Sequence, residues 1–134
     1  MGKKVVVVGR SLLVGKPVAM AFTNRHATVA TVCHKRTKNL EEVTKKADIL
    51  VVAVGKIKLI TKKHVSAGQV IIDVGINMTS DKKLTGDVDF ENVKKIVRAI
   101  TPVPGGIGPM TVASLFENLL LAYESQNHKK IKRK

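Results

Sequence analysis

The sequence repeats one pattern: a short run of β-branched residues, then a glycine or aspartate, then a stretch with helical spacing. Five segments carry such runs, at residues 4–8, 28–33, 49–54, 70–74 and 96–100. Most of these runs are continuous rather than alternating in polarity, which is typical of strands that helices cover on both faces. The alternation of runs and helical stretches predicts an α/β domain with a doubly wound, mostly parallel sheet.

Helices are expected at residues 15–24, 40–46, 61–65 and 90–95, the last of them after an N-cap at Asp89. A longer final helix is expected at residues 111–123, because apolar residues recur there at spacings of three and four. They are Val112, Leu115, Phe116, Leu119, Leu120 and Tyr123. The periodicity then ends, so we expect one domain over residues 1–124 and a basic, disordered tail over residues 125–134.

The composition fits one globular domain that needs no disulfide or metal to hold its core. The chain has 134 residues, of which 44% are hydrophobic, and its single cysteine, Cys33, has no internal partner. No apolar run reaches the roughly 18 residues of a membrane span. We therefore expect a soluble protein in a reducing compartment, the cytoplasm, with the mitochondrial matrix as an alternative, and no membrane partner.

The net charge of +14 indicates a polyanionic partner, such as a phosphorylated small molecule, a nucleic acid or a membrane surface. Five of the last six residues are basic, and Arg10, Lys35, Arg36 and Lys38 add to the charge. Only 3% of the residues are aromatic, so the side chains that stack on bases are scarce. A basic nucleic-acid binder remains an alternative, but the composition does not favour it.

The first predicted strand runs into a glycine turn at the start of a helix. Free backbone amides and the positive end of the helix dipole make such a turn a cradle for phosphate groups. The spacing departs from G-x-G-x-x-G, because Ser11 takes the place of the second glycine and Gly15 comes one residue late. A purely structural turn is therefore the alternative at this point.

The end of the second predicted strand bears on the choice of cofactor. NAD-dependent enzymes usually place a carboxylate there to bind the ribose 2′-hydroxyl. Here the strand is followed by His34, Lys35 and Arg36, with no acidic residue. Since Lys35 and Arg36 would attract a 2′-phosphate, the sequence predicts NADP rather than NAD. The alternative is an ordinary solvated loop.

Several segments together resemble one known family. They are the sequences at residues 7–11, 33–34, 37–40, 47–56, 72–77 and 86–88, and the most specific piece, TPVPGG at residues 101–106 followed by GPMT at residues 108–111. In these segments the chain resembles the bifunctional methylenetetrahydrofolate dehydrogenase/cyclohydrolase of the FolD type, up to about residue 124. Only the family's second half, its NAD(P)-binding Rossmann-like domain, is covered.

The resemblance implies an enzyme that oxidises 5,10-methylenetetrahydrofolate with NADP and hydrolyses the product to 10-formyltetrahydrofolate. The cofactor-binding residues that it implies are Gly9, Arg10, Ser11, Val14, Gly15, His34, Lys35, Arg36, Val54, Gly55, Ile76, Gly106 and Thr111. It further implies a cleft for the folate substrate at Pro102, Pro104 and Gly105. Two departures from the family are Lys35, where it often has serine, and Lys56-Ile57-Lys58, where it often has Lys-Pro-Gly.

The family's proton-transfer group lies in a Tyr-x-x-x-Lys motif of the first half, which this sequence does not contain. We therefore expect no catalytic residue here, and a chain that binds NADP but turns over poorly without a separate or missing catalytic half. In the family the last helix packs on that half, so we expect part of its apolar stripe to be exposed and to mediate association, as a homodimer or with a partner. A non-catalytic NADP-binding or interaction module is the alternative.

Other polar residues have structural interpretations. Cys33 is expected to be a buried filler, and Asp73 is expected to bond nearby loop amides. Asp87 and Asp89 are expected to be turn and cap residues. The histidines show no metal-ligand spacing, so no metal is expected.

Overall fold

The computed structural model describes residues 2–34 and 36–127. Its main sheet has five parallel strands in the spatial order β2-β1-β3-β4-β7. The strands are β1 (Lys4–Val8), β2 (Val29–Cys33), β3 (Ile49–Val52), β4 (Val70–Asp73) and β7 (Ala99–Ile100). The mostly parallel α/β sheet predicted from the sequence is therefore confirmed.

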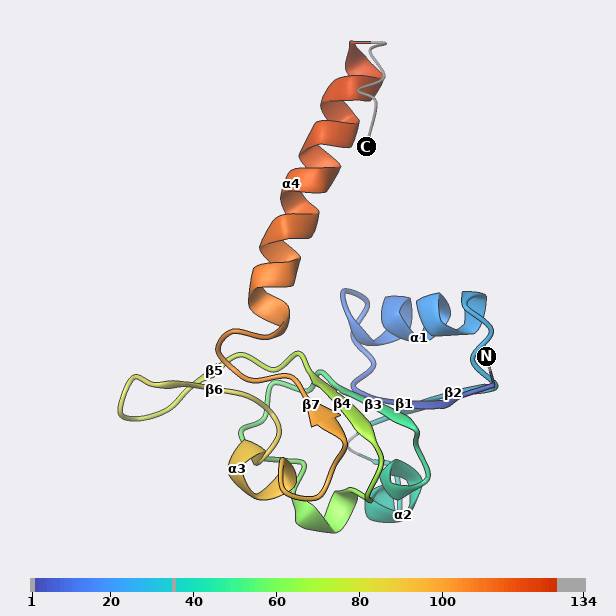
Figure 1. The fold of residues 1–134 in the computed structure, drawn as a ribbon, viewed down its shortest axis with the longest axis vertical. Helices are drawn as coiled ribbons and strands as arrows, with labels where there is room; N and C mark the ends of the chain where they lie inside the picture. The colour runs from blue at the N-terminus through green and yellow to red at the C-terminus, as the bar shows by residue number, and fades with distance from the viewer. Residues whose placement is uncertain (1, 35, 128–134) are drawn as a thin grey trace.

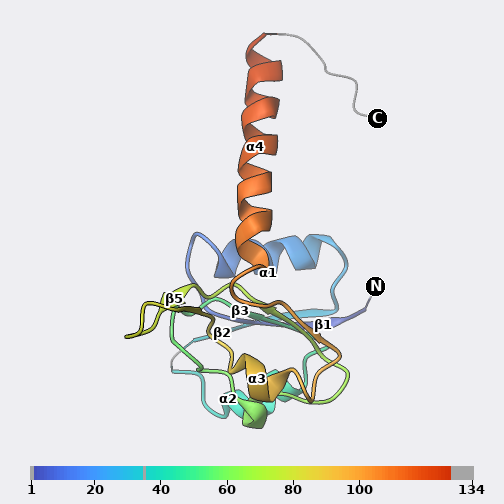
Figure 2. The same ribbon diagram turned by 60° about the vertical axis from the view of Figure 1, so that its left-hand side comes forward.

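Helices cover both faces of this sheet (Figure 1). Helix α1 (Gly15–Asn24) lies on one face; α2 (Leu40–Lys45), the 3-10 helix η1 (Lys62–His64) and α3 (Phe90–Val93) lie on the other. Helix α4 (Ile107–Gln126) leaves the body on the side of α1 and projects away from it in both views (Figures 1 and 2). The fold thus leaves its longest helix without a layer to pack on.

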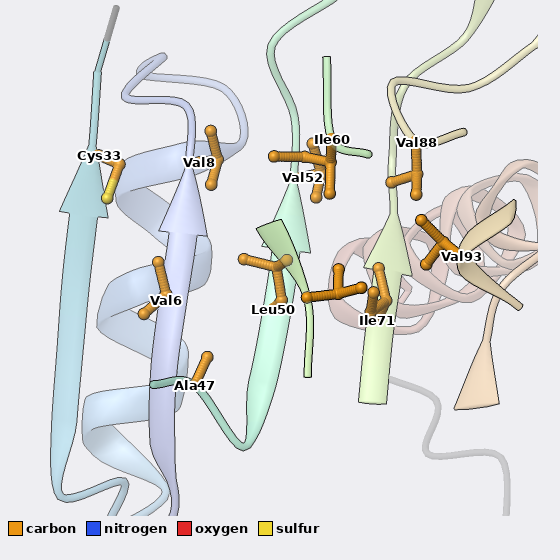
Figure 3. Packing of buried hydrophobic residues seen from close by; sticks show 11 residues of the cluster. Val6, Val8, Cys33, Ala47, Leu50, Val52, Ile60, Ile71, Val88 and Val93 are labelled. Atoms are coloured by element: carbon orange, nitrogen blue, oxygen red, sulfur yellow. The ribbon is translucent and has the colours of Figure 1, made fainter. Parts of the chain in front are cut away.

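The valines of β1 pack into both layers of the core. Val5 and Val7 pack toward α1 with Ala19 and Val51. Val6 and Val8 point to the opposite face, into the larger cluster that Figure 3 shows around Leu50. Because successive side chains of a strand alternate between faces, a strand buried on both sides needs apolar residues at every position.

Two segments differ from the sequence-based expectation. Strand β7 is confined to two residues, because Ile96 lies in the turn after α3, where its amide donates to the Val93 carbonyl at 2.9 Å. Helix α4 begins at Ile107 and includes Pro109 in its first turn, where a missing amide hydrogen costs no helical bond. It continues to Gln126, so residues 125–126 are helical rather than part of a tail; residues 128–134 lie outside the described residues.

The structure adds a hairpin that the sequence did not predict, with antiparallel strands β5 (Asn77–Met78) and β6 (Leu84–Thr85). Two-residue strands are too short to show an alternating pattern.

A second local feature lies at Lys58, one of the departures from the family, where φ is 51°. Left-handed backbone costs an L-residue other than glycine about 1–2 kcal/mol, so this position carries strain that the family's frequent glycine avoids.

The apolar stripe predicted on the last helix is exposed along its whole length. No described residue of α4 is buried, and Leu115, Phe116 and Leu119 each have about two-thirds of their surface accessible, at 67%, 65% and 64%. Within the described residues, no helix is long and apolar enough to cross a membrane.

Candidate functional site

The carboxyl ends of β1, β2 and β3 meet at a pocket of about 440 Å³, which we call the strand-end pocket. Strand β1 continues to β2 on one side, whereas β3 lies on its other side, so the chain reverses direction across the sheet at this point. Open α/β sheets bind ligands at such switch points. The lining residues are Val8, Gly9, Arg10, Ser11, His34, Thr37, Leu40, Ala53, Val54, Lys56 and Leu59.

Gly9 permits the close approach of β1 to β3 at the floor of this pocket. Its φ is 129°, and a Cβ there would overlap the Ala53 carbonyl. Its amide donates to the Cys33 carbonyl at 3.1 Å, which joins the turn to β2. Gly15, at the start of α1, packs in turn against the backbone of Gly9. Both glycines therefore hold the turn close to the sheet, although their spacing is not the usual one.

Ser11 shapes the turn before α1, because its hydroxyl oxygen bonds the backbone there. The Ser11 Oγ accepts hydrogen bonds from the amides of Val14 at 3.1 Å and Gly15 at 3.3 Å. Within the described residues, no acceptor is bonded to the amides of residues 10–13. Of these residues, Arg10 and Ser11 line the strand-end pocket, and their amides, next to the N-terminus of α1, are donors of the kind that a phosphate group requires.

The charge of the strand-end pocket favours an anion. Arg10 and Lys56 line it, and none of its lining residues is Asp or Glu. His34 lies on the β2 side, where its amide donates to the Thr37 hydroxyl oxygen at 2.8 Å. Arg36 is exposed and is not among the lining residues, and Lys35 lies outside the described residues.

The other predicted site residues are divided between a second pocket and a groove. The second pocket, of about 220 Å³, is lined by Ile76, Pro102, Pro104, Gly105 and Gly106 among others. It brings the residues of the predicted folate cleft together with two predicted cofactor-binding residues, Ile76 and Gly106. Val14 and Thr111 instead line an apolar groove of about 720 Å³ between α1 and the start of α4. Gly55 lines neither pocket, although its neighbours Val54 and Lys56 line the strand-end pocket.

The structural interpretations of the buried polar residues are confirmed. The Asp73 carboxylate accepts from the amides of Gly75, Asp87 and Val88 at 2.9–3.1 Å, and burial raises its pKa. Cys33 is fully buried, as expected of a buried filler, and burial raises the pKa of its thiol. Among the described residues, no group of three or more His, Cys, Asp or Glu is placed to hold a metal ion.

Sequence reasoning left out part of the pocket wall. Thr37, Leu40, Ala53, Lys56 and Leu59 line the strand-end pocket but were not predicted to do so. Ala53 follows β3 directly, so its position after a parallel strand is a signal that identifies it. Leu40 and Leu59 come from a helix and a loop, and their apolar character only indicates the core that they also contact.

Comparison with known proteins gives a consistent picture. Residues 1–127 match the family described as tetrahydrofolate dehydrogenase/cyclohydrolase, NAD(P)-binding domain. The bifunctional protein FolD of Halalkalibacterium halodurans is 60% identical over 121 residues, which make up 90% of this chain and 43% of that protein. The FolD of Sulfurihydrogenibium sp. is 61% identical over 123 residues, 92% of this chain and 43% of that protein.

Solved structures agree with these relatives. The dehydrogenase/cyclohydrolase of Campylobacter jejuni superposes with a TM-score of 0.90 at 45% identity, over 93% of this chain and 44% of that one. The Trypanosoma brucei enzyme, solved with NADP cofactor and an inhibitor, gives 0.89 at 37% identity, over 96% of this chain and 46% of that one. The chain thus spans less than half the length of the relatives that it matches. It belongs to the family of tetrahydrofolate dehydrogenase/cyclohydrolase NAD(P)-binding domains.

Proposed function

We propose that this chain is the NADP-binding portion of an enzyme that oxidises 5,10-methylenetetrahydrofolate to the methenyl form and hydrolyses that product to 10-formyltetrahydrofolate. The observation that carries the proposal is the strand-end pocket, where uncommitted amides meet Arg10 and Lys56 with no carboxylate in the lining. The family of the chain and the NADP bound to the Trypanosoma brucei relative support it.

Each group of residues has a separate task in this proposal. The amides of Arg10 and Ser11 bind the pyrophosphate, and the Arg10 side chain binds the 2′-phosphate. Lys35 and Arg36 add positive charge after β2. When NADP is bound, its nicotinamide ring supplies hydride chemistry. Ile76 and the segment 102–106 provide an apolar pocket that keeps water from the place where that ring meets the folate.

Catalysis is proposed to require a complementary portion. The proton-transfer lysine of the family stands in a Tyr-x-x-x-Lys motif, and this sequence does not contain that motif. General acid–base catalysis needs the proton-transfer group within hydrogen-bond reach of the substrate. Adding NADP and methylenetetrahydrofolate to the chain alone should therefore give no turnover above background. Turnover should appear when a protein that carries the family's first half is added.

Calorimetric titration with NADP and NAD tests the cofactor proposal. We expect NADP to bind more tightly than NAD, and Arg10→Ala to weaken NADP binding by about 10- to 150-fold, because a charge-assisted bond contributes about 1.5–3 kcal/mol. Arg36→Ala should weaken it less, since Arg36 does not line the pocket. Lys62→Ala removes an exposed cation on η1, outside the pocket, and serves as the control. Equal affinity for the two cofactors would contradict the proposed selectivity.

We further propose that the exposed stripe of α4 is the surface that docks on the complementary portion, and that isolated chains self-associate through it. Light scattering should give a mass above the 14.5 kDa of one chain, rising with concentration. Replacing Phe116 and Leu119 by lysine should return the mass toward that of a monomer, because charged side chains oppose burial of the stripe. As a control, replacing the exposed Lys45 and Lys46, at the end of α2 and directly after it, by glutamate should leave self-association intact. A wild-type monomer at high concentration would contradict self-association.

A further inference from the structure

A second aspartate, Asp87, lies fully buried between the two pockets and accepts four hydrogen bonds. Its Oδ2 accepts from the amides of Val54 at 2.6 Å and Gly55 at 2.8 Å. Its Oδ1 accepts from the amide of Lys56 and from the Asn77 side-chain amide, both at 2.8 Å. One carboxylate thus holds three successive backbone amides and a side chain from a different loop.

The two loops that Asp87 joins are the rims of the two pockets. Val54 and Lys56 line the strand-end pocket, and Ile76, next to Asn77, lines the second pocket with the segment 102–106. The loop of residues 54–56 follows β3, and within the described residues its amides bond to no other acceptor. Its three residues are exposed, and Gly55 has a φ of 69°. The position of this loop therefore depends on Asp87.

Asp87 is itself held in place from β4. The Asp73 carboxylate, at the end of that strand, accepts from the amides of Asp87 and Val88 at 3.1 and 2.9 Å. Two glycines make the contact possible, because a Cβ at Gly75 would overlap the Asp87 carboxylate and one at Gly86 would overlap the Asp73 carboxylate. The chain of contacts runs from the sheet through Asp73 to Asp87 and from there to both rims.

We propose that Asp87 is a positioning residue for cofactor binding: its carboxylate fixes the 54–56 loop against the strand-end pocket and ties that loop to the Ile76–Asn77 segment of the second pocket. A carboxylate suits this task because it only accepts hydrogen bonds, with about four lone-pair directions for its four donors. Bonds to a charged acceptor are also roughly twice as strong as neutral ones. The proposal concerns the same pocket as the proposed function and rests on it only for the identity of the ligand.

The substitution Asp87→Asn tests this role with almost no change of shape. Whichever way the new amide is turned, its NH₂ group faces two of the four donors. We expect hydrogen exchange of the amides of residues 54–56, followed by mass spectrometry on the full chain, to accelerate at least tenfold. We expect the Kd for NADP to rise by about 10- to 100-fold.

Gln69→Met is the matched control for a purely structural effect. The Gln69 side chain is also buried, and its amide donates to the carbonyls of Thr44, Lys45 and Ala47 while its oxygen accepts from the amide of Ser66. None of these groups lines either pocket. The control should lower the melting temperature as Asp87→Asn does, yet leave exchange at residues 54–56 and the NADP Kd within about twofold of wild type.

Asn77→Ala extends the test to a variant that removes only one donor from a half-buried position. If the two rims are coupled, exchange at residues 54–56 should still accelerate several-fold, although within the described residues no hydrogen bond joins Asn77 to them. Unchanged exchange at residues 54–56 in both Asp87→Asn and Asn77→Ala would overturn the proposal, as would an equal loss of NADP affinity in Gln69→Met. If wild type binds no NADP, the proposed function fails, and the exchange comparison still decides the positioning role.

Discussion

Replacing Gly9 by alanine is expected to abolish measurable NADP binding and to destabilise the domain by about 3–5 kcal/mol. Two costs add. The φ of 129° is strained for any L-side chain, and the new methyl group overlaps the Ala53 carbonyl. Relief requires β1 and β3 to separate at the floor of the strand-end pocket. Urea unfolding of the variant, together with an NADP titration of its folded fraction, measures both effects.

The variant Gly68→Ala separates the cost of backbone strain from the cost of the overlap between a new Cβ and a neighbouring backbone. Gly68 has a φ of 84°, but no atom lies within 4 Å of the place where its Cβ would stand, and it lines none of the pockets described above. This control should lose about 1–2 kcal/mol, the cost of left-handed backbone alone, and keep its affinity for NADP. Equal losses of stability in the two variants would show that the contact between Gly9 and Ala53 contributes nothing.

Strands β1 to β4 and the first helix could be predicted from the sequence because each of them is decided locally. Val5 to Val8 are apolar at every position, and a strand buried on both faces is the arrangement that uses all four. Helix α1 matches its predicted bounds, Gly15–Asn24, since Pro17 lies in the first turn and the glycine turn fixes its start. The anion cradle follows from the same two elements.

Contacts between residues far apart in the sequence could not be predicted in the same way. Asp87 lies more than 30 residues along the chain from the backbone amides that donate hydrogen bonds to it, so no local pattern connects it to the pocket. Sequence reasoning predicted a turn or cap residue at Asp87, whereas its carboxylate bonds a loop that is distant in the sequence. For α4 the periodicity of the apolar stripe predicts the helix correctly. The same periodicity does not identify a surface that packs on the exposed stripe.

His34 offers the sharpest test of cofactor choice, because it lines the strand-end pocket directly after β2, where NAD-dependent enzymes place an acid. His34→Asp is expected to weaken NADP binding by about 100-fold, since the new carboxylate faces the 2′-phosphate at short range and repels it. NAD carries a hydroxyl at that position, and this hydroxyl can donate a hydrogen bond to the carboxylate. The affinity of the variant for NAD should therefore stay the same or rise. Calorimetric titration of the variant with both cofactors should therefore show an inverted preference.

His34→Asn isolates the charge in this experiment, because asparagine has the shape of aspartate without its negative charge. The amide of residue 34 can still donate to the Thr37 hydroxyl oxygen, so the local turn is retained in both variants. We expect the asparagine variant to lose less than tenfold in NADP affinity and to keep its preference for NADP. If asparagine and aspartate weaken NADP equally, the contacts of the imidazole ring hold the cofactor, and the cations of the pocket do not select it by charge.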